Sequence, residues 1–151
     1  MSVAKNVTIS SLGRFSKGQL INKKQEKESV LHYKDAMRIK TPSLDQSVKL
    51  LSGGNQQKVS IAKSLSTQPK ILIMDEPTRG VDVGAKKEIY ELMNEFKRNG
   101  LGILMISSEI PELLGVCDRI MVMSEGKIAG VLSRDKANSN EIMRLAIGAG
   151  V

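Results

Sequence analysis

Two short apolar runs, separated by one amphipathic segment, are the feature of the sequence that most constrains the fold. Residues 71–74 (Ile-Leu-Ile-Met) lead directly into Asp75 and Glu76, and residues 103–106 form a second apolar run. Between them, the apolar side chains of residues 84–99 recur at helical spacing. Continuous apolar strands are typical of parallel sheets buried on both faces. The pattern therefore predicts an α/β fold with a mainly parallel sheet.

The flanking segments carry helix and hairpin signals. Gly53 and Gly54 open a helical segment that ends near Pro69, and Asn22 is in position to cap an earlier helix that ends before Pro42. After the second apolar run we expect three further elements: a short helix near residues 111–114, a hairpin of residues 119–124 and 127–133, and a last helix over residues 140–147 that Ser139 caps.

Positive charge is concentrated in the first third of the chain. Residues 1–50 contain ten Lys and Arg against four Asp and Glu, whereas residues 51–151 contain thirteen against twelve. Nucleic acid is a common partner of basic proteins, but Phe15 and Tyr33 are the only aromatic side chains of this stretch that could stack on bases. We interpret the charge as a solvated helical surface and expect no nucleic-acid partner.

Residues 51–58 (Leu-Ser-Gly-Gly-Asn-Gln-Gln-Lys) are the first candidate site. Glycines at the start of a helix allow close approach of the backbone, and the N–H groups of the first turn favour a phosphate. Ser52 adds a hydroxyl donor. By itself, the same pattern also occurs in ordinary capping turns.

Asp75 and Glu76 are the second candidate site. Two adjacent carboxylates at the end of a buried strand are costly unless a cation is near. In phosphoryl-transfer sites, an Asp at this place holds Mg²⁺ and a neighbouring acid orients or deprotonates the attacking water. The alternative is a helix cap next to a surface acid.

Together, these segments resemble the motifs of ABC-type ATPases. Residues 51–58 resemble the signature motif, and residues 71–75 with Glu76 resemble the Walker B strand and catalytic acid. Gly80-Val81-Asp82 resembles the inter-domain loop. Residues 106–109 stand at the switch-loop position, and residues 118–127 match the terminal strands. Residues 55–58 and 80–90 are similar to the monosaccharide (ribose-type) importers, in particular to their C-terminal ATPase domain.

The resemblance implies a partial ABC-type P-loop ATPase domain with a helical subdomain, divided into residues 1–68 and 69–151. It implies that ATP held by a partner domain is bound in trans by Ser52, Gly53, Gly54, Asn55 and Gln56. It further implies that Glu76 and Ser108 are catalytic, that Asp75 holds Mg²⁺, and that Asp82 lies in the inter-domain loop. Ser108 stands where most ABC ATPases have a histidine, which predicts two unequal ATP sites in the complete protein.

The sequence contains no Gly-x-x-x-x-Gly-Lys-[Ser/Thr] motif to hold the β- and γ-phosphates of ATP. We therefore expect the chain to be the C-terminal part of a subunit with two fused ATPase domains, and to bind ATP and Mg²⁺ weakly by itself. We also expect exposed apolar sheet faces and self-association.

The function implied is ATP hydrolysis that powers monosaccharide import, of ribose by similarity, at the cytoplasmic face of the membrane. The implied partners are the N-terminal ATPase domain of the same subunit, the membrane-spanning permease and, indirectly, a sugar-binding protein. One alternative is a non-catalytic interaction module. Another is a fragment of a DNA-repair ABC ATPase, although those proteins insert long coiled coils before the signature.

Overall fold

The computed structural model describes residues 1–18 and 20–148, and the chain divides into two compact units, Met1–Met105 and Ile106–Val151. Helices alternate with short strands from residue 53 onward, so the predicted α/β class is confirmed. The predicted division between residues 68 and 69 stays a prediction. In the described ranges, no helix has the length and apolar character needed to cross a membrane.

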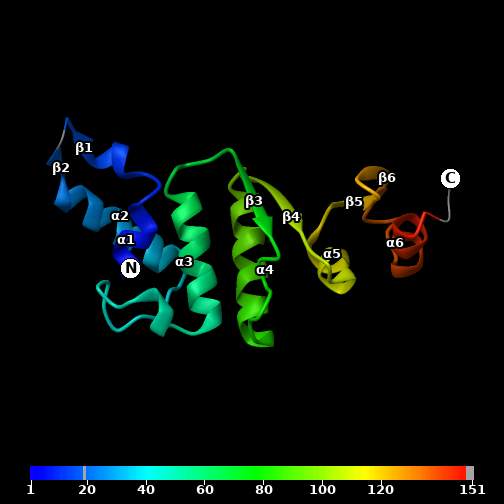
Figure 1. Ribbon diagram of the computed structural model, residues 1–151, viewed down its shortest axis with the longest axis horizontal. Helices are drawn as coiled ribbons and strands as arrows, with labels where there is room; N and C mark the ends of the chain where they lie inside the picture. The colour runs from blue at the N-terminus through cyan, green and yellow to red at the C-terminus, as the bar shows by residue number, and fades with distance from the viewer. Residues whose placement is uncertain (19, 149–151) are drawn as a thin grey trace. The chain divides into compact units, whose positions relative to one another are not determined.

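The first unit begins with a group of helices (Figure 1). It contains α1 (Val3–Thr8), the 3₁₀ helix η1 (Leu12–Phe15), the strands β1 (Ser16–Lys17) and β2 (Leu20–Ile21), α2 (Lys23–Ala36), η2 (Val48–Leu50) and α3 (Gly53–Leu65). The predicted cap of α2 is confirmed, because Asn22 Oδ1 accepts a hydrogen bond from the Gln25 N–H. α1 carries no strong sequence signal, yet Val3 and Val7 are fully buried one helical turn apart.

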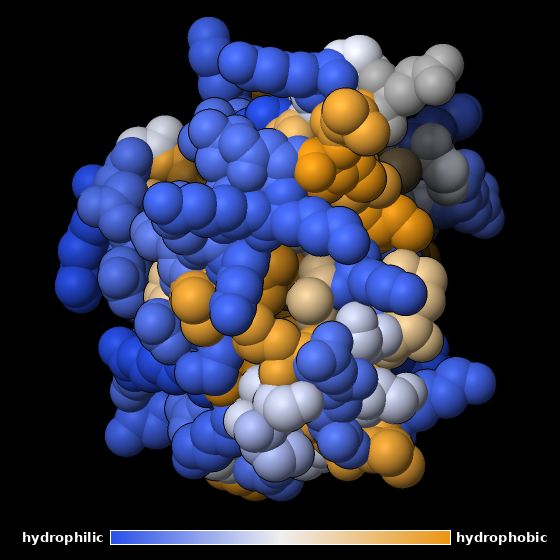
Figure 2. Space-filling model, turned by 90° about the vertical axis from the view of Figure 1, so that its left-hand side faces the viewer, coloured by the Kyte–Doolittle hydropathy of each residue, from blue (hydrophilic) through white to orange (hydrophobic). Residues whose placement is uncertain are grey.

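The face shown in Figure 2 is mostly hydrophilic, as expected for the basic first third, with some apolar residues among the polar ones. A pocket of about 610 Å³ opens between α1 and α2, and its lining includes Ile9, Leu12, Ile21 and Lys27. None of the predicted site residues lines this pocket.

Residues of the first third hold α3 near both of its ends. At the C-terminal end, Tyr33 Oη donates to the Leu65 carbonyl at 2.9 Å and the Arg14 guanidinium donates to the Ser66 carbonyl. A cation at this position also interacts favourably with the helix dipole. At the N-terminal end, the backbone N–H of Lys40 donates to the Asn55 side chain. The helical region therefore fixes the orientation of the helix that begins at the signature segment.

The strand–helix–strand unit consists of β3 (Ile71–Asp75), α4 (Val83–Arg98) and β4 (Gly102–Ile106), and β3 pairs with β4. The Gly102 N–H donates to the Lys70 carbonyl at 3.0 Å, so the two strands start side by side, as expected for parallel neighbours. The predicted inward face of α4 is confirmed, with Ile89, Leu92 and Met93 buried.

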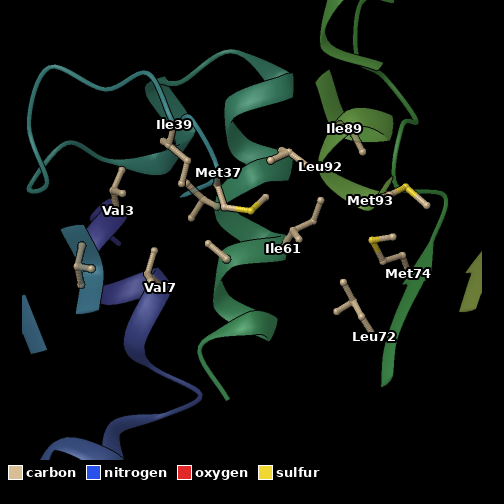
Figure 3. Packing of buried hydrophobic residues seen from close by; sticks show 13 residues of the cluster. Val3, Val7, Met37, Ile39, Ile61, Leu72, Met74, Ile89, Leu92 and Met93 are labelled. Atoms are coloured by element: carbon tan, nitrogen blue, oxygen red, sulfur yellow. The ribbon is translucent and has the colours of Figure 1, made fainter. Parts of the chain in front are cut away.

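The expectation of an exposed apolar sheet face is confirmed for β3, and the expectation that this strand is buried on both faces is wrong. Leu72 and Met74 are buried in a core with Ile61 of α3 and Met93 of α4 (Figure 3), whereas Ile71 and Ile73 are 64% and 65% exposed. Successive side chains of a strand point to opposite faces, and in the described chain only one face of this sheet is covered. An uninterrupted apolar run does not reveal this difference, because both of its faces are equally apolar.

The second unit contains α5 (Ile110–Val116), β5 (Arg119–Ser124), β6 (Lys127–Ser133) and α6 (Ser139–Ala146). The predicted hairpin is confirmed: β5 and β6 pair antiparallel, and Glu125 and Gly126 both have positive φ angles, as a two-residue type I′ turn requires. The predicted cap of the last helix is wrong by one residue. Asn138 caps α6, because its Oδ1 accepts from the Glu141 N–H at 2.9 Å.

Candidate functional site: the N-terminus of α3 and its supports

The signature segment forms the exposed N-terminus of α3. Ser52 is the residue before the first turn, and its backbone is extended (ψ 154°), like that of Ser2 before α1 (ψ 164°). Both Ser52 and Gly53 are exposed. Unlike Ser2 at the start of α1, Ser52 makes no side-chain capping hydrogen bond in the part of the chain that the structure describes. The first N–H groups of a helix need an acceptor, and an anion can supply one. The N-terminus of α3 is therefore chemically suited to a phosphate.

The side chains of Asn55 and Gln56 are engaged within the segment. Asn55 Oδ1 accepts from the Lys40 backbone N–H at 2.8 Å, and Asn55 Nδ2 donates to Ser52 Oγ at 2.9 Å. Gln56 Nε2 donates to the Leu51 carbonyl at 2.8 Å. These amides shape the loop that presents Ser52. Whether they also contact a nucleotide stays a prediction.

Both glycines of the segment allow a close approach within the protein. A Cβ atom on Gly54 would lie 2.6 Å from the Cβ of Ala85 in α4, and one on Gly53 would lie 3.1 Å from the Gly80 carbonyl oxygen. Gly54 is buried, whereas Gly53 is exposed. Gly54 thus brings α3 against α4, a packing role that the sequence analysis did not predict. Its predicted role in binding a phosphate stays untested.

Lys58 and Glu88 form an ion pair across the same helix contact. The Lys58 side chain is only 2% exposed, and its Nζ contacts the Glu88 carboxylate and, at 3.4 Å, the Arg38 carbonyl oxygen. The hydrogen bond and positive charge of Lys58 lower the pKa of Glu88, with smaller contributions from Lys40 and Arg38. Burial of the Lys58 ammonium is acceptable because it is paired and hydrogen-bonded.

Sequence reasoning missed this pair. Lys58 lies four residues after Gly54, and Glu88 lies three residues after Ala85, so each lies on the same helix face as the glycine or alanine of the close contact. The helix contact itself had to be known before this spacing became informative. A pocket of about 250 Å³ lies beside the pair, and its lining includes Ser52, Asn55, Asp82 and Glu88.

Asp82 caps α4. Its Oδ1 accepts from the Ala85 N–H at 2.9 Å, which satisfies one of the first N–H groups of the helix. The Asp82 side chain is therefore held in place at the end of a loop that contains Gly80, whose carbonyl oxygen lies close to Gly53 of α3. Its predicted role between two ATPase domains stays a prediction.

Asp75 and Glu76 lie where β3 ends. Asp75 is exposed and Glu76 is half-buried, and Glu76 has φ 46°, a left-handed conformation that is uncommon for a residue with a side chain. Such backbone conformations cluster at functional sites. Oxygen donors are the ligands of Mg²⁺, which commonly takes only one or two carboxylates together with water and substrate phosphates. The exposed Asp75 carboxylate fits that role by its chemistry, although the described residues contain no cluster of three metal-ligating side chains.

Ser108 belongs to the second unit, so its predicted action with Glu76 stays a prediction. It is exposed and follows Ser107, whose hydroxyl donates to the Glu112 carboxylate at 2.9 Å and accepts from the Glu109 N–H at 3.0 Å. Ser107 thus shapes the turn that carries Ser108 into α5.

Two curated relatives are ribose import ATP-binding proteins, RbsA, from Clostridium perfringens strain SM101 / Type A and strain 13 / Type A. Each is 56% identical to this chain over 149 residues, which is 98% of this chain and 30% of the relative. The chain therefore spans less than a third of the length of these relatives. This identity favours neither the non-catalytic nor the DNA-repair alternative.

Solved structures agree on the fold. MJ1267, an ATP-binding cassette of an ABC transporter, superposes with a TM-score of 0.77 at 25% identity, over 95% of this chain and 58% of that one. A nucleotide-free ATP-binding cassette from an ABC transporter gives a TM-score of 0.79 at 22% identity, over 96% of this chain and 62% of that one, and shows the fold alone.

The family model described as ABC transporter matches residues 1–79, which is more than half of the 151 residues. This match covers the helical region, the signature segment, β3 and the acidic pair. The chain belongs to the ABC transporter family.

Proposed function

We propose that the chain acts within an ATP-hydrolysing subunit that powers import of a monosaccharide, ribose by similarity to the relatives named above. In this proposal the N-terminus of α3 faces ATP held by another ATPase domain. The observation that carries it is the exposed start of α3, where the Ser52 side chain does not cap the helix. The Lys58–Glu88 ion pair holds α3 against α4 behind this residue. The N–H groups of the first turn and the Ser52 hydroxyl then donate to the phosphate of that ATP.

The acidic pair serves a second, weaker site in this proposal. Asp75 holds Mg²⁺, which when bound neutralises phosphate charge, and Glu76 orients the attacking water. Ser108 stands in place of the usual histidine and has no positive charge to offer the γ-phosphate. We therefore propose that the α3 N-terminus contributes more to transport than Glu76 does.

The proposed partners follow from the same similarity. They are the N-terminal ATPase domain of the same subunit, a membrane-spanning permease and, indirectly, a sugar-binding protein. The subunit is proposed to lie peripherally on the cytoplasmic face of the membrane. Because the sequence lacks the phosphate-loop motif, residues 1–151 alone should bind Mg-ATP weakly. Calorimetry that gave micromolar affinity would contradict this expectation.

The substitution Ser52→Asp tests the role of the α3 N-terminus in the complete transporter. Aspartate is a good N-cap, so α3 should be at least as stable, but its charge repels a phosphate at the same place. We expect ATPase activity to fall by more than about 100-fold, because charge stabilisation at such donors has effects of that order. Thermal unfolding should not shift downward. Ser60→Asp, an exposed position on the same helix, is the matched control and should leave activity close to wild type.

Glu76→Gln tests the proposed inequality of the two sites. We expect it to retain clearly more ATPase activity than Ser52→Asp when both are measured in the same reconstituted transporter. If Glu76→Gln abolished activity while Ser52→Asp left it normal, the proposed inequality would be wrong.

A further inference from the structure

We propose that Asn55 is a positioning residue, whose side chain fixes the direction in which the Ser52 hydroxyl donates its hydrogen. The inference rests on the proposed function, because it assigns the Ser52 hydrogen, which points away from the Asn55 amide, to the phosphate of ATP. It also changes the expected role of Asn55 from a nucleotide contact to a support for one.

The direction of each hydrogen bond follows from the backbone of Lys40. A backbone N–H can only donate, so the Asn55 atom that lies 2.8 Å from it must be the carbonyl oxygen. The amide nitrogen of Asn55 then faces Ser52 Oγ at 2.9 Å. An amide nitrogen only donates, so Ser52 Oγ is the acceptor and its own hydrogen must point elsewhere. The orientation of the Asn55 amide is thereby fixed by the Lys40 backbone N–H, which can only donate.

The segment that supplies this backbone N–H is itself held in place. Ile39 is 4% exposed, and its N–H donates to the Lys34 carbonyl at 2.9 Å. The Arg38 carbonyl accepts from Lys58, which is paired with Glu88. Lys40 therefore presents its N–H from a segment that is anchored to α2, α3 and α4. Asn55 transmits that fixed position to Ser52.

Two substitutions separate this role from other roles of Asn55. In Asn55→Asp both side-chain oxygens can only accept, so the Lys40 bond persists while Ser52 must turn its hydrogen inward. In Asn55→Leu, which has nearly the same size, both bonds are lost and the hydroxyl can rotate freely. The first variant should remove the outward donor, and the second should only weaken its orientation.

The first measurement is ATPase activity of the complete transporter in a double-mutant cycle with Ser52→Ala. We expect Ser52→Ala to lower kcat/KM by about 10-fold, the size of one hydrogen bond to a charged group. Asn55→Asp should lower it at least as much in the wild-type background, but by a clearly smaller factor in the Ser52→Ala background. The added negative charge acts in both backgrounds, so only the difference between them reports the direction of the hydroxyl. Asn55→Leu should lower kcat/KM by a smaller factor, about threefold.

The second measurement needs no nucleotide. Amide hydrogen exchange at Lys40 should be faster in Asn55→Leu than in wild type, because Lys40 is exposed and its N–H is held by Asn55. Asn55→Asp should keep the exchange slow. Ser60→Ala on the exposed side of α3 is the control and should leave it unchanged.

The outcomes distinguish this inference from the proposed function. If Ser52→Ala left the ATPase activity unchanged, the α3 N-terminus would not serve ATP and both would fail. If Ser52→Ala lowered activity but Asn55→Asp caused equal losses in both backgrounds, the positioning role alone would be refuted. Unchanged Lys40 exchange in Asn55→Leu would refute it as well.

Discussion

Helices α3 and α4 both follow a residue that commonly caps helices, and both have glycine as their second residue, but only α4 is capped by that side chain. α3 begins at Ser52-Gly53-Gly54-Asn55 and α4 at Asp82-Val83-Gly84-Ala85. Asp82 accepts from the backbone N–H three residues later, whereas Ser52 Oγ accepts from the Asn55 side chain instead. The cap residue of α4 therefore satisfies one of the first N–H groups of its own helix. The start of α3 has no such side-chain cap, and the loop before it is held by the bond from the Lys40 N–H to Asn55.

The largest effect on this comparison should come from removing the ion pair that holds the two helix starts together. Glu88→Ala leaves the buried Lys58 ammonium without its carboxylate, so we expect a loss of about 3 kcal/mol in the free energy of unfolding. Lys58→Met should cost less, about 1 kcal/mol, because Glu88 is 40% exposed and water can solvate it. Chemical denaturation measures both.

The exposed Arg38–Glu91 pair provides the control for that experiment. Its side chains are 57% and 49% exposed, so Glu91→Ala should cost less than about 1 kcal/mol. If Glu88→Ala cost no more than Glu91→Ala, the two helix starts would not depend on the Lys58–Glu88 pair.

A smaller effect is expected from the glycine at the helix contact. Gly54→Ala places a Cβ atom 2.6 Å from that of Ala85, so the helices must move apart at a cost of about 2 kcal/mol. Ala85→Gly should recover part of this loss when it is combined with Gly54→Ala, because it removes the opposing methyl group. Thermal unfolding of the two single variants and the double variant measures the recovery. Additive losses would mean that the contact is not the cause.

The smallest effect tests the comparison most directly. Asp82→Ala removes a working cap and should lower the free energy of unfolding by about 1 kcal/mol. Ser52→Ala removes a hydroxyl that does not cap, so its effect on stability should stay within about 0.5 kcal/mol. Equal stability losses in the two variants would mean that the two termini are used in the same way.

Local patterns gave most of the secondary structure, because each depends on neighbours in the sequence. The Asn22 cap, the apolar face of α4 and the turn at Glu125 and Gly126 all belong to this class. The error at the α6 cap arose because Asn138 and Ser139 are adjacent and both are suitable capping residues. Exposed apolar sheet faces were expected in general, but the apolar run of β3 did not show which of its residues would be exposed, since burial depends on what covers a sheet rather than on its own apolar residues.

The sequence by itself determined which segments are candidates for the chemistry: a glycine pair at the start of a helix and an acidic pair at the end of a strand. Only the tertiary structure decided how their atoms are used. Asn55 meets Lys40 across 15 residues, and Lys58 meets Glu88 across 30. Such bonds form only when packing brings distant segments together, and this packing sets Gly54 against α4 and holds the Asn55 amide that donates to Ser52 Oγ.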